Sequence, residues 1–289
     1  MAWPVVGEPV WWEFAIRGVM LRGTVQRRAG MSASGAVVAV HGGPGVDGAG
    51  LRHVLAPLAE DAELVVPDQR GHGRSDLATA ASWRLDDWAD DLAGVIGALQ
   101  LHRPVVVGVS FGGWVALRYA ARHPGQLGGL VIAASTARLL SVEEGAERMG
   151  SLGGPASAAA RRAAYAEPDL EASPAFERHV LSLMAVREPG PALRAVRAAQ
   201  VKTPQVNAHF TPQFSRLDLT DDARQVRCPA TVVVGELDPL TTPQLAAATA
   251  DACPGRARLR LVPHAAHDLL TDAPDILLEE IHWALAARD

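Results

Sequence analysis

Short apolar runs alternate with amphipathic stretches along much of the chain. The apolar runs are rich in valine, leucine and isoleucine and predict buried strands, which span residues 37–40, 63–66, 104–107, 130–133, 230–234 and 259–262. Helical periodicity marks residues 51–60, 86–100 and 113–122. This alternation predicts an α/β fold, in which a mostly parallel, doubly wound sheet carries helices on both faces.

Two regions depart from the alternation. Residues 11–16 and 20–26 read as strands on either side of a short turn and predict an antiparallel hairpin. Between Arg138 and Val226 the strand pattern stops, and helix-like pieces broken by proline and glycine take its place, at residues 142–149, 156–166, 174–187 and 191–199. Because a structureless loop of this length is uncommon in a compact domain, we expect an inserted helical cap that roofs the active site. The expected division is residues 1–137 and 227–289 for the two parts of the core and 138–226 for the cap.

A candidate nucleophile lies where one of these strands meets a helix. The run Gly108-Val109-Ser110-Phe111-Gly112 directly follows the strand expected at 104–107. A serine on such a sharp strand-to-helix turn, the nucleophile elbow, needs small residues two positions before and after it, because the strand and helix backbones crowd together there. Gly108 and Gly112 meet this need, so Ser110 is the expected nucleophile.

Glycines also mark a candidate oxyanion loop upstream. Residues 37–40 run into His41-Gly42-Gly43-Pro44-Gly45, whose glycines leave backbone N–H groups uncovered. A serine nucleophile generates an oxyanion, and we expect its two N–H donors to come from Phe111 and Gly43. Four nearby polar residues are expected to be structural, either as hydrogen-bonding histidines or as anchors of the turn beneath the elbow: His41, His72, Asp68 and Arg70.

The acid and the base are expected after the last two strands. Residues 230–234 lead to Asp238, the expected acid, and Glu236 is a nearby rival carboxylate. Residues 259–262 lead to His267, the expected base, and His264 is its rival. The chain order serine, aspartate, histidine, each at the carboxyl end of a strand, is that of the α/β-hydrolases and not that of trypsin-like or subtilisin-like enzymes.

The chain resembles the α/β-hydrolase superfamily over essentially its whole length, and within it the proline iminopeptidase group. Three motifs carry the second resemblance, namely His41-Gly42-Gly43-Pro44-Gly45, Asp68-Gln69-Arg70-Gly71-His72-Gly73-Arg74-Ser75 and Ser82-Trp83-Arg84-Leu85. The elbow departs from that group, which usually has Gly-Gly-Ser-Trp-Gly, and is closer to general esterases and lactonases. The resemblance implies the α/β-hydrolase fold and a base at His267, since the family's catalytic histidine follows a small residue.

These parts predict a serine hydrolase that acts through an acyl-enzyme. His267 takes the proton of Ser110, Asp238 orients the imidazole, and an activated water then releases the acid. The resemblance implies proline iminopeptidase-like cleavage of an N-terminal aminoacyl bond, for which the cap must present carboxylates to the free amine. Seven glutamates are available in the cap, and the sequence selects none of them: Glu143, Glu144, Glu147, Glu167, Glu171, Glu177 and Glu188. A carboxylesterase or lactonase acting on a small ester is the alternative, and a ligand-binding protein on a hydrolase fold is a third possibility.

Composition narrows the classes of partner, cofactor and cellular location that the protein can have. The 289 residues are 48% hydrophobic and 20% charged, which suits a compact enzyme, and the net charge of −5 comes without a basic block, which argues against nucleic acid as a partner. No metal-ligand spacing and no phosphate or dinucleotide glycine pattern occurs, so we expect no metal and no cofactor. The two cysteines, Cys228 and Cys253, are not spaced as a disulfide framework, and we find no secretory signal and no apolar stretch of membrane length. We therefore expect a reduced cytoplasmic protein that acts on a small molecule or short peptide and not at a membrane. The sequence leaves the oligomeric state open.

Overall fold

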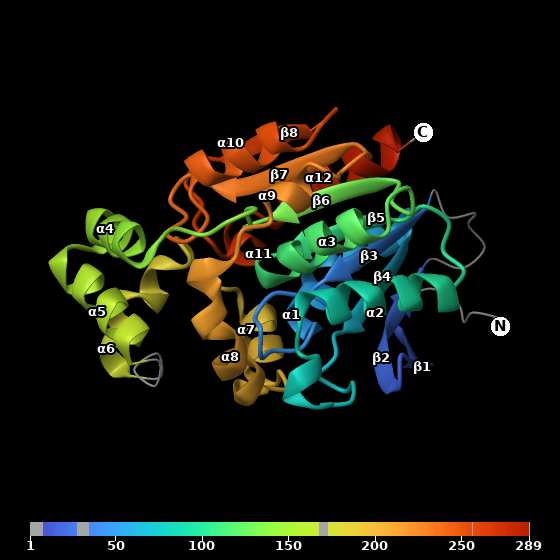
Figure 1. The fold of residues 1–289 in the computed structure, drawn as a ribbon, viewed down its shortest axis with the longest axis horizontal. Coiled ribbons are helices and arrows are strands. Elements are labelled where there is room, and N and C mark those ends of the chain that lie inside the picture. The colour runs from blue at the N-terminus through green and yellow to red at the C-terminus, as the bar shows by residue number, and fades with distance from the viewer. Residues whose placement is uncertain (1–7, 28–34, 168–172, 256, 289) are drawn as a thin grey trace.

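An eight-stranded sheet forms the centre of the computed structural model, which describes residues 8–27, 35–167, 173–255 and 257–288 (Figure 1). The strands, in the order in which they lie in the sheet, are β1 (Val10–Ile16), β2 (Val19–Gln26), β4 (Glu63–Asp68), β3 (Ala36–Val40), β5 (Val105–Val109), β6 (Gly129–Ala133), β7 (Ala230–Gly235) and β8 (Ala257–Val262). The pairings of β1 with β2 and of β2 with β4 are antiparallel, and all others are parallel. The predicted fold class, an α/β fold with a mostly parallel sheet, is confirmed.

The centre of the sheet is buried on both faces because its strands are apolar at every position. In β3, Val38 and Val40 pack into the core on one face, and Val37 and Ala39 pack into the core on the other. Side chains alternate in direction along a strand, so an uninterrupted apolar run supplies both cores. Every residue of β3, β5 and β6 is buried, whereas β8, the outermost strand of the sheet, has exposed positions.

Helices cover both faces of the sheet. Those on one face are α2 (Leu85–Ala98), α3 (Phe111–Arg122) and α10 (Pro243–Ala252), and those on the other are α1 (Ala49–Leu55), α11 (Leu269–Asp272) and α12 (Pro274–Ala287). The single helix predicted over residues 51–60 is interrupted, since α1 is followed by a 3-10 turn at Ala56–Glu60. Pro57 favours this change, because proline has no N–H to donate to the α-helical ladder.

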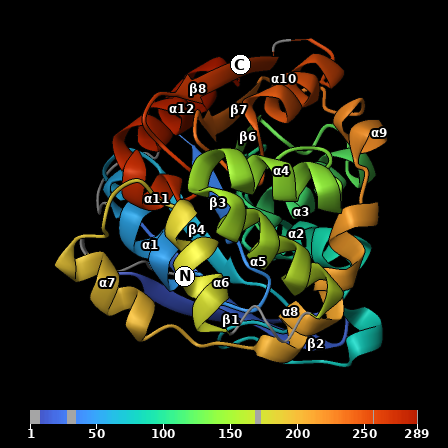
Figure 2. The same ribbon diagram turned by 90° about the vertical axis from the view of Figure 1, so that its left-hand side faces the viewer.

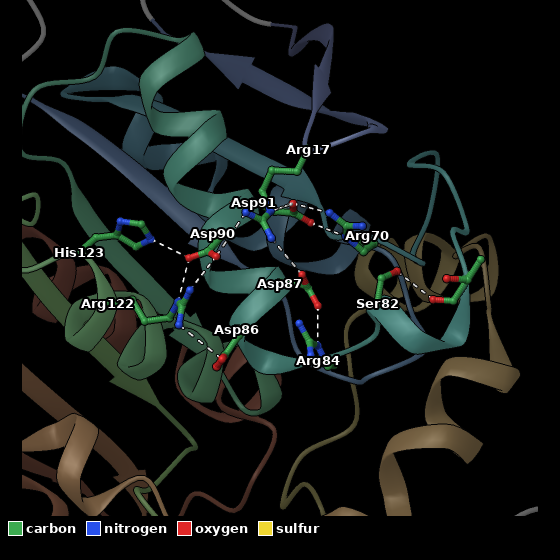
Figure 3. Close-up of polar contacts among 11 residues, drawn as sticks. Arg17, Arg70, Ser82, Arg84, Asp86, Asp87, Asp90, Asp91, Arg122 and His123 are labelled. Atoms are coloured by element: carbon green, nitrogen blue, oxygen red, sulfur yellow. Dashed lines mark hydrogen bonds and ion pairs between the residues drawn. The ribbon is translucent and has the colours of Figure 1, made fainter.

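Ion pairs fasten α2 to its neighbours (Figure 3). Arg70, in the loop after β4, binds Asp91 through two hydrogen bonds of 2.8 and 2.7 Å, and both side chains are buried. Arg122 of α3 binds Asp90 through two hydrogen bonds of 2.8 Å. Breaking a buried pair by removing one partner leaves an uncompensated charge, so the Arg70–Asp91 pair holds the loop against α2. The more exposed Arg122–Asp90 pair adds a weaker contact between α2 and α3. The Arg70–Asp91 pair matches the anchoring role expected for Arg70.

Between β6 and β7 the described residues form helices. These are α4 (Val142–Gly153), α5 (Pro155–Ala166), α6 (Pro174–His179), the 3-10 turn η4 (Leu181–Leu183), α7 (Pro191–Ala198), α8 (Pro204–Phe210), the 3-10 turn η5 (Thr211–Arg216) and α9 (Thr220–Ala223). Figure 1 shows α4, α5 and α6 beyond one end of the sheet, and Figure 2, turned by 90°, shows them in front of it. The sequence did not predict α8 or α9. The division of the chain into core and cap stays a prediction.

The helix expected over residues 174–187 is shorter than predicted. It ends at His179, and the chain then makes one 3-10 turn. Beyond that turn the backbone hydrogen-bonds with a distant segment: the carbonyl of Met184 accepts from the N–H of Asp268 at 2.7 Å, and the N–H of Val186 donates to the Asp272 carboxylate at 3.0 Å. These tertiary hydrogen bonds replace the intrahelical ones that the periodicity predicted.

Three further observations concern the described part of the chain. None of its helices combines the length and the apolar composition that crossing a membrane requires. No group of three or more histidine, cysteine, aspartate or glutamate side chains in these ranges is arranged to hold a metal ion. Cys228 and Cys253 are both free and buried.

Candidate active site

Ser110 occupies the sharp turn between β5 and α3. Its backbone has φ 52° and ψ −119°, a conformation that residues other than glycine rarely adopt. The flanking glycines have no room for a side chain: a Cβ on Gly108 would overlap the backbone of Gly112, and a Cβ on Gly112 would overlap the carbonyl oxygen of Val40. The strand, the strained serine and the crowded glycines form the turn that the motif predicts.

The structure brings the three expected catalytic residues together. The Oγ atom of Ser110 lies 3.0 Å from Nε2 of His267, and Nδ1 of His267 lies 2.9 Å from Oδ2 of Asp238. Asp238 follows β7 and His267 follows β8, so both reach the carboxyl edge of the sheet, where β5 delivers Ser110. The three side chains come from positions far apart in sequence but form one continuous hydrogen-bonded chain.

Asp238 is fully buried and well supplied with donors. Its Oδ1 accepts from the backbone N–H groups of Leu240 and Thr241, both at 2.8 Å, and its Oδ2 accepts from the Thr241 hydroxyl at 2.6 Å. Burial raises the pKa of Asp238, but the attraction and hydrogen bond of His267 and the Thr241 donors lower it more, so the carboxyl pKa falls below its ordinary value. Sequence patterns did not predict a role for Thr241, because that role depends on the fold of this turn.

The electrostatics of His267 mirror those of Asp238. Burial lowers the pKa of the imidazole, while the adjacent Asp238 carboxylate and its hydrogen bond raise it, and the net pKa lies above the ordinary value of 6.5. With Nδ1 facing a carboxylate, the proton of the neutral ring is held on Nδ1, and Nε2 is left as the acceptor that faces Ser110. This is the state in which an imidazole can accept the proton of the hydroxyl.

The rival residues lie elsewhere. Neither Glu236 nor His264 lines the pocket beside Ser110. Instead, the Glu236 carboxylate, in the loop after β7, accepts from the backbone N–H of His264, in the loop after β8, at 3.4 Å and in an exposed place. Their proximity in sequence to Asp238 and His267 therefore does not place them in the hydrogen-bonded chain.

The two expected oxyanion donors flank Ser110. Gly43 and Phe111 both line the pocket, and neither backbone N–H has a hydrogen-bond partner among the described residues. For Phe111 this follows from its position as the first residue of α3, since the first N–H groups of a helix have no intrahelical acceptor. The loop packs against the elbow so closely that a Cβ on Gly42 would lie 3.2 Å from the Cβ of Ser110.

Two further histidines, both buried, support the oxyanion loop. The Nε2 atom of His41 accepts from the N–H of Gln69 at 3.2 Å, and the ring of His72 packs edge-on against that of His41, with centroids 5.1 Å apart. Burial lowers the pKa of both rings, and for His72 it lowers the pKa to about 3. Both histidines are therefore neutral at pH 7 and serve as hydrogen-bonding supports, as expected.

A pocket of about 260 Å³ opens beside Ser110 and His267. One side of it is the carboxyl edge of the sheet with its loops, which we call the sheet edge. The opposite side comes from the helices between β6 and β7. We call this second side the helical wall, which consists of Arg161, Tyr165, Phe176, Leu181, Met184 and Phe214. Sequence reasoning identified none of these residues as part of the site, because their periodicity is that of ordinary packing positions.

The described glutamates that were considered as amine ligands are not in the pocket. Six of the seven lie among the described residues, all six are exposed, and none lines the pocket. Glu143 instead pairs with Arg162, Glu188 pairs with Arg194, and Glu144 caps the first turn of α4. Glu171 lies outside the described residues.

The segment between β6 and β7 is tied to the loop that carries His267. Arg197 of α7 binds Asp268 through two hydrogen bonds of 2.6 and 2.8 Å. The buried Asp272 carboxylate accepts from the N–H of Ala266 at 2.8 Å, and also from the N–H groups of Val186 and Arg187 at 3.0 and 2.9 Å. One carboxylate thus joins the residue before His267 to the segment that follows Met184.

Similarity to known proteins agrees with this geometry. The model of the alpha/beta hydrolase fold family matches residues 35–274. The 2-hydroxymuconate semialdehyde hydrolase of a Pseudomonas species is 38% identical over 108 residues, which is 37% of this chain and 38% of that protein. The proline iminopeptidase of Heyndrickxia coagulans is 36% identical over 89 residues, which is 30% of this chain and 31% of that protein. The alignments thus span between 31% and 38% of the length of these two curated relatives.

A solved structure extends the comparison to nearly the whole chain. The crystal structure of a proline iminopeptidase from Mycobacterium smegmatis has a TM-score of 0.80 with this protein and covers 97% of this chain and 100% of that one. The two are 22% identical, a level at which the likeness concerns the fold alone. Because the family model covers most of the sequence and the fold agrees, the chain belongs to the alpha/beta hydrolase fold family.

Proposed function

We propose that the protein is a serine hydrolase that forms an acyl-enzyme on Ser110. The observation that carries this proposal is the chain of hydrogen bonds from Ser110 through His267 to Asp238, at 3.0 and 2.9 Å. A serine hydroxyl is a weak nucleophile at neutral pH, so a neutral imidazole within hydrogen-bond distance must remove its proton during attack. Asp238 then stabilises the imidazolium that forms.

The remaining steps use the groups around Ser110. As its Oγ bonds to the substrate carbonyl carbon, negative charge moves to the carbonyl oxygen, and we expect the backbone N–H groups of Gly43 and Phe111, which line the same pocket, to stabilise it. His267 gives its proton to the leaving group, and the C–O or C–N bond breaks to leave the acyl-enzyme. Water activated by the same imidazole releases the acid and restores Ser110.

For the substrate, we propose a small carboxylic ester. No carboxylate lines the pocket in the described part of the chain. A free N-terminal ammonium buried without an anionic partner would be strongly disfavoured, because the charge would leave water uncompensated. An ester has no such requirement, and a volume of about 260 Å³ suits a small acyl group.

Proline iminopeptidase-like cleavage is the second candidate. It is supported by the Gly-Gly-Pro loop at residues 42–44, by the similarity to the Heyndrickxia coagulans enzyme and by the fold shared with the Mycobacterium smegmatis enzyme. This candidate needs an anionic partner for the amine, which the described pocket lining does not supply.

We also propose that the helices within residues 138–226 act as a cap over the pocket, since Arg161 and Met184 line it together with Ser110. The free, buried thiols of Cys228 and Cys253 support the proposal that the enzyme works in a reducing cytoplasm.

A panel of activated substrates tests the proposed function. We expect turnover of short-chain 4-nitrophenyl esters, with a stoichiometric fluorophosphonate adduct on Ser110, and slow cleavage of prolyl arylamides. Cleavage of prolyl arylamide that disappears on N-acetylation would favour the iminopeptidase instead. The absence of both steady turnover and a nitrophenol burst would leave a ligand-binding protein on a hydrolase fold.

A further inference from the structure

Among the described residues that line the pocket, Arg161 of α5 carries the only permanent charge. Its guanidinium carbon lies 4.4 Å from the centre of the Tyr165 ring, and an NH2 group donates to the Tyr165 hydroxyl at 3.1 Å. The two residues are four apart on one helix, a spacing that places their side chains on the same face. The aromatic ring therefore holds the guanidinium in a defined place within the helical wall.

Arg161 lacks the partner that its neighbour has. No carboxylate in the described ranges forms an ion pair with it, and its Nε atom is shielded from solvent without a hydrogen-bond acceptor. Arg162, the next residue, faces outward and pairs with Glu143. A cationic N–H group that is shielded from water and has no acceptor destabilises the protein. A guanidinium in this state within a pocket is therefore suited to bind an anionic group of the ligand.

The rest of the lining strengthens this preference. Ser135 also lines the pocket and is 1% exposed, and its hydroxyl has no hydrogen-bond partner among the described residues. Most of the other wall residues are apolar, including Phe176, Leu181 and Met184. In such surroundings a charge-assisted hydrogen bond is less screened by water and is therefore stronger.

We propose that Arg161 binds a carboxylate of the substrate, so that the preferred ester carries a second, free acid group. This inference rests on the proposed hydrolase function and names the substrate class of the same site. A guanidinium presents its N–H groups in one plane and matches both oxygens of a carboxylate, which a lysine ammonium does not. The same charge repels a substrate ammonium, so Arg161 also opposes the iminopeptidase alternative.

Two matched esters test the proposal. The mono-4-nitrophenyl ester of adipic acid has a free carboxylate, and methyl 4-nitrophenyl adipate is its neutral counterpart. The ratio of their kcat/KM values, corrected for uncatalysed hydrolysis, is measured for the wild type and for Arg161→Met, Arg161→Lys and the control Arg162→Met. We expect the wild type to prefer the free acid by about 10- to 100-fold, the range for a hydrogen bond to a charged group. Arg161→Met should bring the ratio close to one, Arg161→Lys should restore part of it, and Arg162→Met should retain it.

Binding of free adipate to the Ser110→Ala variant gives a readout that does not depend on turnover. Adipate should bind, and adding Arg161→Met should weaken the affinity at least 10-fold, whereas adding Arg162→Met should not. An ester preference or adipate affinity that is the same with and without Arg161 would overturn the proposal. If neutral esters are nevertheless hydrolysed and Ser110→Ala abolishes that turnover, the proposed hydrolase function stands while this inference fails.

Discussion

The sheet edge and the helical wall meet across one pocket but are held in different ways. At the sheet edge, Ser110 lies on a turn with no space for a side chain on either flanking glycine, and Asp238 receives three hydrogen bonds besides that of His267. On the helical wall, Leu181 is 48% exposed and belongs to a single 3-10 turn. The sheet edge is fixed from several directions, whereas the side chains of the helical wall come from α5, α6 and two 3-10 turns, and most of them are at least partly exposed.

This difference separates two tasks. Bond making and breaking require distances held within a fraction of an ångström, which a buried sheet supplies. Selection of a substrate requires shape and charge, which can change on short helices without disturbing the sheet. We therefore expect substitutions at the sheet edge to change the rate for every substrate, and substitutions on the helical wall to change the order of preference among substrates.

Ser110→Ala should have the largest effect. Loss of a triad serine lowers kcat by roughly 10^6-fold in serine hydrolases, because the covalent pathway is lost. Ester kinetics together with circular dichroism would check this. Residual activity above about a tenth of the wild-type value, in a folded variant, would contradict the role assigned to the sheet edge.

Asp238→Asn should have the next largest effect, about 10^4-fold in kcat. The amide NH2 facing Nδ1 favours the tautomer with the proton on Nε2, which cannot accept from Ser110. Glu236→Gln is the matched control, since its carboxylate lies outside the hydrogen-bonded chain. Comparable losses in both variants would show that the acid was assigned wrongly.

Asp272→Ala tests the contact between the two regions. It leaves the N–H groups of Ala266, Val186 and Arg187 without their acceptor, so we expect a loss of about 1–3 kcal/mol in the free energy of unfolding. Because Ala266 precedes His267, kcat should also fall, by about 10-fold, for all esters alike. Denaturant unfolding and kinetics would measure both, with the exposed Asp275→Ala as the control. A change confined to substrate preference would assign Asp272 to the helical wall alone.

The smallest expected effect is a shift in the pH dependence of kcat/KM. His267 must be neutral to act, and its pKa is raised above 6.5, so kcat/KM should fall on acidification through a pKa above that value. Asp238→Asn should move this limb to lower pH. Stability should respond in the opposite sense: the charged His267–Asp238 pair stabilises the fold fully below the unfolded pKa, and this contribution is lost as pH rises through the folded pKa. A limb at or below 6.5 in the wild type would contradict the raised pKa.

The sequence predicted the sheet edge well because its signals are local. Strand runs such as 104–107 and 130–133 are apolar at every position, and Gly108 and Gly112 are required by the turn itself. The helices between β6 and β7 were predicted less well. The helix expected over residues 174–187 ends at His179, and beyond it the N–H of Val186 donates to the Asp272 carboxylate and not to an intrahelical carbonyl.

By itself, the sequence determined the strand–helix alternation, the elbow at Ser110 and the positions of Asp238 and His267 after their strands, because each follows from residues adjacent in the chain. Only the tertiary structure decided that Thr241 supports Asp238, that the six described glutamates considered for the cap lie outside the pocket, and that Arg161 lies inside it with no acidic partner among the described residues. The physical reason is that burial and charge compensation depend on which distant segments pack together. Arg161 and Arg162 are the same residue type at adjacent positions, and only packing gives Arg162 an acidic partner and leaves Arg161 with none among the described residues.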